Sequence, residues 1–201
     1  MSDVYLGRLP ILDTKQNVVA YELLFRADHH NKAIVANNSA ASANVIIETY
    51  GQLGIDNVIG KRRGFIKVDA QLLMHDSILL LPKKHVVLEI LRGVEITESI
   101  TQRCAFLKQK GYQLALSYTA QSSTHYDHIL SLVNIVKINV NELTSAHLIA
   151  VMKQLRRFPI LLLAEKVETQ ETAKHCISLN FQMLQGFFFT QPEVMSGKNI
   201  D

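Results

Sequence analysis

A regular alternation of short apolar runs with longer helix-like patterns limits the fold of this sequence more than any other feature. The apolar runs are rich in Val, Ile and Leu and are apolar at successive positions, which is typical of strands that are buried on both faces. They occupy residues 64–69, 85–91, 112–118, 135–140, 159–167 and 183–189. Segments with apolar residues at helical spacing lie between or before them, at residues 42–54, 70–81, 96–111, 125–133, 144–158 and 169–180. The alternation predicts a largely parallel sheet with helices packed outside it.

The first strands break this order. Two apolar runs, at residues 4–12 and 18–25, are joined by the five polar residues of "DTKQN", which favours a hairpin. Together with the six later runs they give eight candidate strands, which is the number in a closed α/β barrel. We therefore expect the α/β class, with a TIM-like barrel whose first strand is antiparallel. The barrel domain is expected over residues 1–190, and residues 191–201 are expected to begin a linker, toward a further domain outside this chain.

Composition excludes some classes of partner. The net charge of the 201 residues is only +3, and the basic cluster at residues 61–63 has no aromatic residues interleaved with it, so no nucleic-acid partner is expected. No stretch approaches the ~20 apolar residues of a membrane helix, so no membrane partner is expected either. Cys104 and Cys176 lack metal-ligand spacing and are typical of buried thiols in a reducing compartment. A cytoplasmic protein is expected.

Ionisable residues end four of the predicted strands. Glu22 follows "VVAY", Glu89 follows "HVVL", Lys137 follows "IV" and Glu165 follows "ILLLA". The carboxyl ends of barrel strands meet at one mouth, where active sites are assembled, so these side chains are expected to face one another. Unrelated charges on the barrel rim are the alternative. Three carboxylates and a lysine at one mouth would suit divalent cations and phosphoester hydrolysis.

The motifs around these residues resemble the EAL domains, bacterial phosphodiesterases that hydrolyse cyclic di-GMP. "ELLFR" matches their E-x-L-x-R signature, and "LEIL", "KIN", "AEKVET" and "QGFFFTQP" follow in the family's order. The opening "YLGRLPILDTKQNVVAYELLFR" is similar to the subgroup in which an HDOD domain follows the EAL domain.

The resemblance implies roles for individual residues. Glu22, Glu89 and Glu165 would be metal ligands, and Lys137 would orient the attacking water or stabilise the phosphate. The residues implied to contact or support a bound cyclic di-GMP are Arg26, Glu168 and Gln185.

The departures from the family pattern are as informative as the matches. Lys67 stands where the family has an asparagine metal ligand, and Ser117 and Tyr118 stand where it has a pair of aspartates. Asn139 replaces a further aspartate, and Lys166 replaces a glycine. The loss of both paired aspartates removes negative charge that two metals would share, and Lys67 adds positive charge at the same place.

These substitutions predict a disabled site. The vestigial catalytic set would be Glu22, Lys67, Glu89, Ser117, Tyr118, Lys137, Asn139 and Glu165, and the three glutamates, as vestigial metal ligands, are expected to hold no metal. We expect the ammonium of Lys67 to occupy the metal position and pair with Glu22 or Glu89; the alternative is that Lys67 points outward and the carboxylates are hydrated.

The predicted function is a non-catalytic EAL-like regulatory or interaction module in bacterial signal transduction. Its expected partner is a protein or an adjacent effector domain, and a homodimer is one expected assembly. A weak cyclic di-GMP sensor and a residual cyclic di-GMP phosphodiesterase are the alternatives. No cofactor is expected, with Mg²⁺ or Mn²⁺ needed only for residual phosphodiesterase activity.

Overall fold

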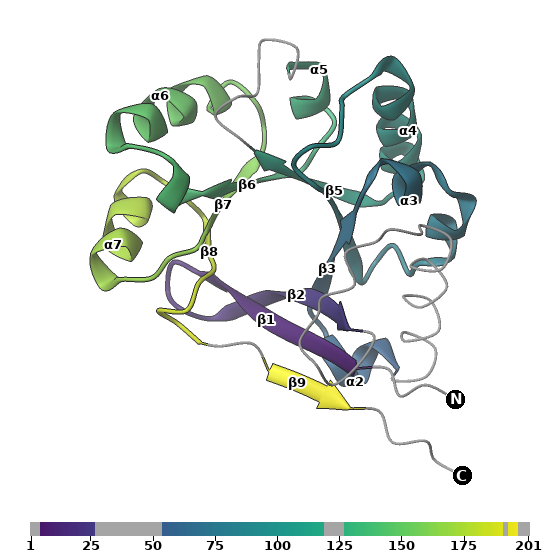
Figure 1. Ribbon diagram of the computed structural model, residues 1–201, viewed down its shortest axis with the longest axis horizontal. Coiled ribbons are helices and arrows are strands. Elements are labelled where there is room, and N and C mark those ends of the chain that lie inside the picture. The colour runs from purple at the N-terminus through teal and green to yellow at the C-terminus, as the bar shows by residue number, and fades with distance from the viewer. Residues whose placement is uncertain (1–4, 27–53, 119–126, 191–192, 197–201) are drawn as a thin grey trace.

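The strands form a closed barrel. The computed structural model describes residues 5–26, 54–118, 127–190 and 193–196. From the second to the eighth, the strands lie side by side in chain order, and the first strand closes the ring by pairing with both the eighth and the second. Figure 1 shows helices arranged around the outside of the strands. The predicted barrel is confirmed.

The antiparallel first strand is also confirmed. β1 (Tyr5–Asp13) pairs antiparallel with β2 (Val18–Arg26) and, through Leu12 and Asp13, with β8. All other neighbours from β2 to β8 are parallel. The remaining barrel strands are β3 (Arg63–Val68), β4 (Val86–Ile90), β5 (Gln113–Tyr118), β6 (Ile135–Asn139), β7 (Leu161–Glu165) and β8 (Met183–Leu184).

Helices connect the parallel strands. Their bounds are α2 (Ile55–Ile59), α3 (Ala70–Met74), α4 (Glu98–Gln109), α5 (Asp127–Leu130), α6 (Ser145–Leu155) and α7 (Gln170–Ser178), with 3₁₀ helices η1 (Asp76–Leu80) and η3 (Val140–Glu142). A threonine precedes each of α4, α6 and α7, and its hydroxyl accepts an N–H from the first turn. Each of these N-caps typically stabilises its helix by ~1 kcal/mol. The helix expected over residues 42–54 lies almost entirely outside the described residues.

Three segments differ from their sequence-based predictions. The helix expected over residues 70–81 is divided at His75, whose backbone is extended and whose Nδ1 accepts the Ser77 N–H to cap η1. The strand expected over residues 183–189 ends at Leu184, because the chain turns where Gly186 packs against the backbone of Val167. Within the stretch expected to begin a linker, β9 (Glu193–Ser196) pairs antiparallel with the start of β1.

The part of the barrel interior nearer the amino ends of the parallel strands is an apolar layer. Alternate residues of a strand point to the same side of a sheet, so one residue from each strand contributes to each interior layer. The buried members of this layer are Ile11, Ala20, Phe65, Val87, Ala115, Ile135, Leu163 and Met183. A larger apolar cluster lies between the strands and the helices. In the described part of the chain, no helix has the length and apolar character needed to cross a membrane.

Candidate functional site

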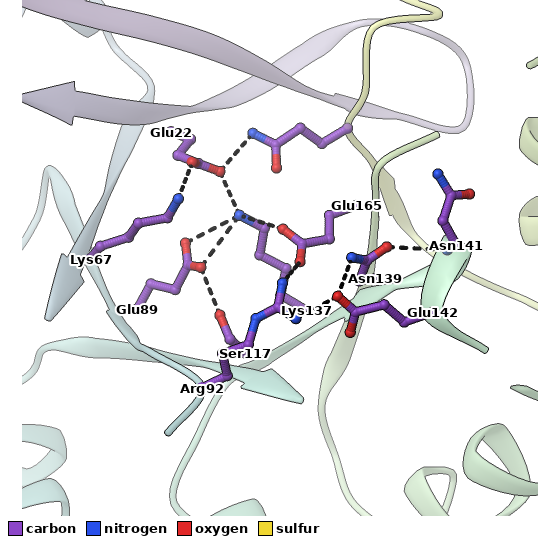
Figure 2. Close-up of polar contacts among 11 residues, drawn as sticks. Glu22, Lys67, Glu89, Arg92, Ser117, Lys137, Asn139, Asn141, Glu142 and Glu165 are labelled. Carbon is purple, nitrogen blue, oxygen red and sulfur yellow. Dashed lines mark hydrogen bonds and ion pairs between the residues drawn. The ribbon is translucent and has the colours of Figure 1, made fainter. Parts of the chain in front are cut away.

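A polar layer lies directly above the apolar layer. In seven of the strands or their extensions, the residue two positions after the apolar-layer residue also points into the barrel. These seven residues are Glu22, Lys67, Glu89, Ser117, Lys137, Glu165 and Gln185. The period of two residues along a strand therefore brings together the four ionisable strand-end residues that the sequence singled out. They converge at the carboxyl ends of the parallel strands (Figure 2).

Lys137 is the centre of this layer. Its side chain has no solvent exposure, and its Nζ lies 2.5 Å from Glu22 Oε2, 3.2 Å from Glu165 Oε2 and 3.3 Å from both carboxylate oxygens of Glu89. Burial by itself would lower the pKa of Lys137, but the three glutamates outweigh burial and raise it. Lys137 is therefore a permanent cation enclosed by carboxylates.

Glu22 is held by three donors. Besides Lys137, Lys67 Nζ lies 2.7 Å from Oε1, and Gln185 Nε2 donates to Oε2 at 2.9 Å. Burial acts to raise the pKa of Glu22, but Lys137 and Lys67 together outweigh burial and lower it to about 2. The ion pair expected for Lys67 is thus confirmed, with Glu22 as its partner. The Lys67 side chain is 41% exposed, whereas that of Glu22 is 6% exposed. Lys67 therefore lies between Glu22 and solvent at the mouth of the barrel.

Glu89 is the least compensated carboxylate of the layer. Ser117 Oγ donates to its Oε1 at 2.8 Å, and Lys137 contacts both of its oxygens at the longer distance given above. Burial raises the pKa of Glu89, and the nearby charge of Glu22 adds to this shift, against the opposing effect of Lys137. The pKa values of the two buried glutamates are thus shifted in opposite directions, because Glu22 pairs with both Lys137 and Lys67 whereas burial outweighs the attraction of Lys137 at Glu89.

A third cation, after Lys137 and Lys67, reaches the site from the loop after β4. Arg92 Nη2 lies 3.7 Å from Glu165 Oε1, and its Nη1 donates to Glu142 Oε1 at 2.6 Å. Asn139 Nδ2 donates to the same Glu142 oxygen at 2.8 Å. Neither Arg92 nor Glu142 was among the site residues predicted from the sequence. The available signal was the position of Arg92, which is only two residues beyond the end of β4.

The other predicted site residues have different surroundings. Tyr118 is buried in the cluster between strands and helices, because its neighbour Ser117 takes the interior position. Glu168 is exposed and lines the cavity described below. The backbone of Arg26 ends β2, but its side chain lies outside the part of the chain that the structure describes.

A cavity of about 210 Å³ opens beside the polar layer. Its lining includes Glu22, Lys67, Glu165, Glu168 and Gln185. Further lining residues are Leu9, Leu24, Lys166, Gly186 and Phe187. The Lys166 ammonium lies 5.9 Å from the centroid of the Phe187 ring, and Lys166 has a φ of 62°, in the left-handed region that favours glycine.

The donor set does not fit divalent cations as it stands. Mg²⁺ and Ca²⁺ bind through anionic and carbonyl oxygens. Here every carboxylate oxygen of Glu22, Glu89 and Glu165 lies within 4 Å of an ammonium or guanidinium nitrogen. A cation entering the layer would have to displace Lys67 or Lys137 against their charge. Over the described residues, no group of three or more His, Cys, Asp or Glu side chains forms a metal-binding cluster.

Comparison with known proteins identifies the family. The model of the EAL domain family matches residues 9–192 of this chain. The uncharacterized protein YuxH of Bacillus subtilis is 30% identical over 201 residues, which cover 98% of this chain and 49% of YuxH. The cyclic di-GMP phosphodiesterase CdgJ of Vibrio cholerae is 30% identical over 207 residues, covering all of this chain and 47% of CdgJ. The chain thus spans about half the length of these curated relatives.

Solved structures of EAL proteins share the fold. The Bacillus subtilis YkuI protein, in complex with cyclic di-GMP and calcium, superposes with a TM-score of 0.76 at 22% identity, over 99% of this chain and 56% of YkuI. The EAL domain of Mycobacterium smegmatis DcpA superposes with a TM-score of 0.75 at 24% identity, over 94% of this chain and 92% of the DcpA chain. With a family match over most of its length and two relatives at 30% identity, this chain belongs to the EAL domain family.

Proposed function

We propose that this EAL domain acts in cyclic di-GMP signalling as a regulatory or interaction module that does not hydrolyse the dinucleotide. The observation that carries the proposal is the occupation of every carboxylate oxygen of Glu22, Glu89 and Glu165 by a cationic side chain. Lys67 supplies its ammonium where the family pattern has an asparagine metal ligand. On this reading the polar layer is a structural ion-pair network.

The energetic basis is the cost of placing a metal beside these ammonium groups. Two unit charges at 4 Å interact by ~4 kcal/mol at an effective dielectric constant of 20, and a divalent ion experiences about twice that repulsion. Ser117 offers only a neutral hydroxyl in place of an aspartate, and it is already donating to Glu89. A metal would therefore lack the paired aspartates of the family pattern and would find every remaining carboxylate oxygen already paired with a cation.

The module is proposed to act through protein contacts. Its partner would be another protein or an adjacent effector domain, and the resemblance of the opening segment to the HDOD-associated subgroup makes an HDOD domain the expected neighbour. The relatives' greater length supports such an arrangement. A cytoplasmic location and assembly as a homodimer are parts of the same proposal.

Binding of cyclic di-GMP without hydrolysis is the second candidate function. The cavity beside the polar layer favours it, because Lys67 and Lys166 offer cations to phosphates and Phe187 offers a ring surface to a base. Residual phosphodiesterase activity is the third candidate, and the name of CdgJ, at 30% identity, favours it. Each candidate predicts a different result in the same experiment.

The experiment is a calorimetric titration with cyclic di-GMP, followed by chromatography for the linear product, in the absence and presence of Mg²⁺, Mn²⁺ or Ca²⁺. The proposal predicts no product under any condition and no effect of the metals on binding. Binding without product would establish the sensor. Linear product in the presence of a metal would refute the proposal.

A gain-of-function variant tests whether Lys67 and Ser117 are the reason that a metal does not bind. Lys67→Asn with Ser117→Asp removes the ammonium and restores a carboxylate, while Tyr118 is left unchanged because it packs in the apolar cluster. We expect this double variant to bind a divalent cation that the wild type does not bind. Lys174→Asn, at an exposed position of α7, is the matched control and should show no such gain.

A further inference from the structure

The segments that lead into the parallel strands carry nearly all of their charge with one sign. These segments are residues 13–19, 60–63, 81–85, 108–112, 131–134, 156–161 and 178–182, and in a parallel barrel they lie together at the amino ends of the strands. They contain ten Lys and Arg residues and one Asp, for a net charge of +9, although the whole chain carries only +3. The basic residues are Lys15, Lys61, Arg62, Arg63, Lys83, Lys84, Lys108, Lys110, Arg156 and Arg157. We call this surface the basic face.

Most of this charge faces solvent without compensation. All ten basic residues are exposed except the half-buried Arg63. Within the described residues, only Arg157 forms an ion pair, with Asp127 at 3.4 Å. The one acidic residue, Asp13, accepts the backbone N–H groups of Lys15 and Asn17 in its own turn. Favourable contacts of cations with helix C-termini account for four of the ten, since Lys108 and Lys110 end α4 and Arg156 and Arg157 follow α6. The other six lie in turns, in loops or at the start of β3.

Several basic side chains join one loop to the next. Arg62 Nε donates to Val18 O at 2.7 Å, and Arg63 Nε donates to Lys84 O at 3.3 Å. Lys83 Nζ donates to Lys110 O at 2.9 Å. Lys108 Nζ donates to Ser131 O at 3.0 Å. These acceptors are neutral carbonyl groups, so the contacts order the basic face into a continuous arc over β2 to β6 and leave its charge in place.

Exposed aliphatic side chains accompany the arc. Leu80 is 71% exposed and lies at the end of η1, three residues before Lys83. Leu79, Val19 and Leu161 are also exposed, in the same or neighbouring segments. An anionic bilayer attracts clustered Lys and Arg residues, and apolar side chains next to them enter the boundary between headgroups and acyl chains.

We propose that the basic face binds the surface of an anionic phospholipid bilayer. We expected no membrane partner because no apolar segment could span a bilayer, but that property does not describe where charges lie on the surface. A nucleic acid is the less favoured partner, because the exposed apolar residues of the face are aliphatic and offer no stacking surface for bases. Bound in this way, the barrel would direct the mouth with the polar layer away from the bilayer, whatever the function of that mouth.

Co-sedimentation with vesicles tests the proposal. The full chain should sediment with vesicles of phosphatidylcholine mixed with phosphatidylglycerol, and not with vesicles of phosphatidylcholine alone. Raising the salt concentration should release it, because exposed charges are screened. Equal sedimentation with both kinds of vesicle, or none with either, would overturn the proposal.

Two variants locate the contact. Lys61→Gln with Lys84→Gln should weaken partitioning by about fivefold per lysine, and hence about 30-fold for the pair. The control, Lys166→Gln with Lys174→Gln, removes the same charge from exposed positions outside the basic face and should change partitioning much less. Leu80→Ser should weaken partitioning without altering net charge. If the pair K61Q/K84Q and L80S both bind as well as the wild type, the basic face is not the contact.

A competition separates lipid from nucleic acid. A single-stranded polyuridylate should not displace the chain from mixed vesicles at equal phosphate concentration. Displacement, together with wild-type behaviour of L80S, would assign the face to nucleic acid and refute the lipid proposal.

Discussion

Replacing Lys137 with Met removes the central cation of the polar layer while nearly preserving side-chain length. At an effective dielectric constant of 20, each of its three carboxylate contacts at ~3 Å contributes an attraction of ~5 kcal/mol, which is offset by several kcal/mol for burying the charges. The variant would leave Glu22, Glu89 and Glu165 facing one another without that lysine. Loss of one member of a buried ion pair typically costs 3–5 kcal/mol, so we expect a decrease of ~4 kcal/mol in the free energy of unfolding at about pH 7.

The decrease should depend on pH with a defined sign. In the wild type, the lowered pKa of Glu22 stabilises the fold above its ordinary value of 4.5, and this stabilisation is lost as pH falls toward about 2. In K137M, Glu22 and Glu89 lose the lysine that lowers their pKa values, so we expect those pKa values to rise and the destabilisation to be small at low pH and to grow as pH rises through them. The difference between wild type and variant should therefore be larger at about pH 7 than at about pH 5.

Urea unfolding followed by circular dichroism at both pH values measures this difference. Lys153→Met, at an exposed position of α6, is the control and should change the free energy of unfolding by less than ~0.5 kcal/mol. A loss below ~1 kcal/mol for K137M, or an equal loss at both pH values, would contradict the ion-pair account of the layer.

Three further substitutions test neighbouring features by the same unfolding measurement. Glu89→Gln removes a carboxylate whose pKa is raised by burial, so stability at about pH 7 should be unchanged or increased by ~1 kcal/mol, and a loss above ~2 kcal/mol would show that the charge is needed. Gly186→Ala should cost at least ~3 kcal/mol, since the new Cβ would lie 2.0 Å from Val167 O. In Gly93→Ala the new Cβ meets no atoms within 4 Å and causes only the strain of a positive φ, so an equal loss for the two variants would contradict this. Lys166→Gly should stabilise by up to ~1 kcal/mol by relieving its positive φ, whereas the same change at Lys174 within α7 should destabilise by ~1 kcal/mol.

The barrel was predictable because its signals are local. Apolar runs of strand length, helical spacing and capping threonines each depend on a few neighbouring residues, and the structure has strands and helices close to the expected positions. The two-residue period along a strand was enough to bring Glu22, Glu89, Lys137 and Glu165 to one layer.

The details that sequence reasoning missed depend on contacts between distant segments. The central position of Lys137 depends on the stagger between neighbouring strands. This stagger determines which of several inward-pointing side chains reaches the barrel axis. Arg92 joins the layer only because its loop folds toward Glu142, fifty residues away. The early end of β8 reflects the close approach of Gly186 to Val167, and the strand β9 depends on an edge of β1 that β8 leaves unpaired.

The order in which the layer's members are synthesised has a consequence for folding. Glu22 and Glu89 precede Lys137 by 115 and 48 residues, and β1 cannot meet β8 until Leu184 has left the ribosome. Contacts between such distant residues are slow to form because a long segment of chain must first be ordered. Until the barrel closes, we expect both carboxylates to remain hydrated, because burying a charge before its partner is in place is costly. The same charges that pair inside the finished barrel should therefore oppose premature collapse of its first strands.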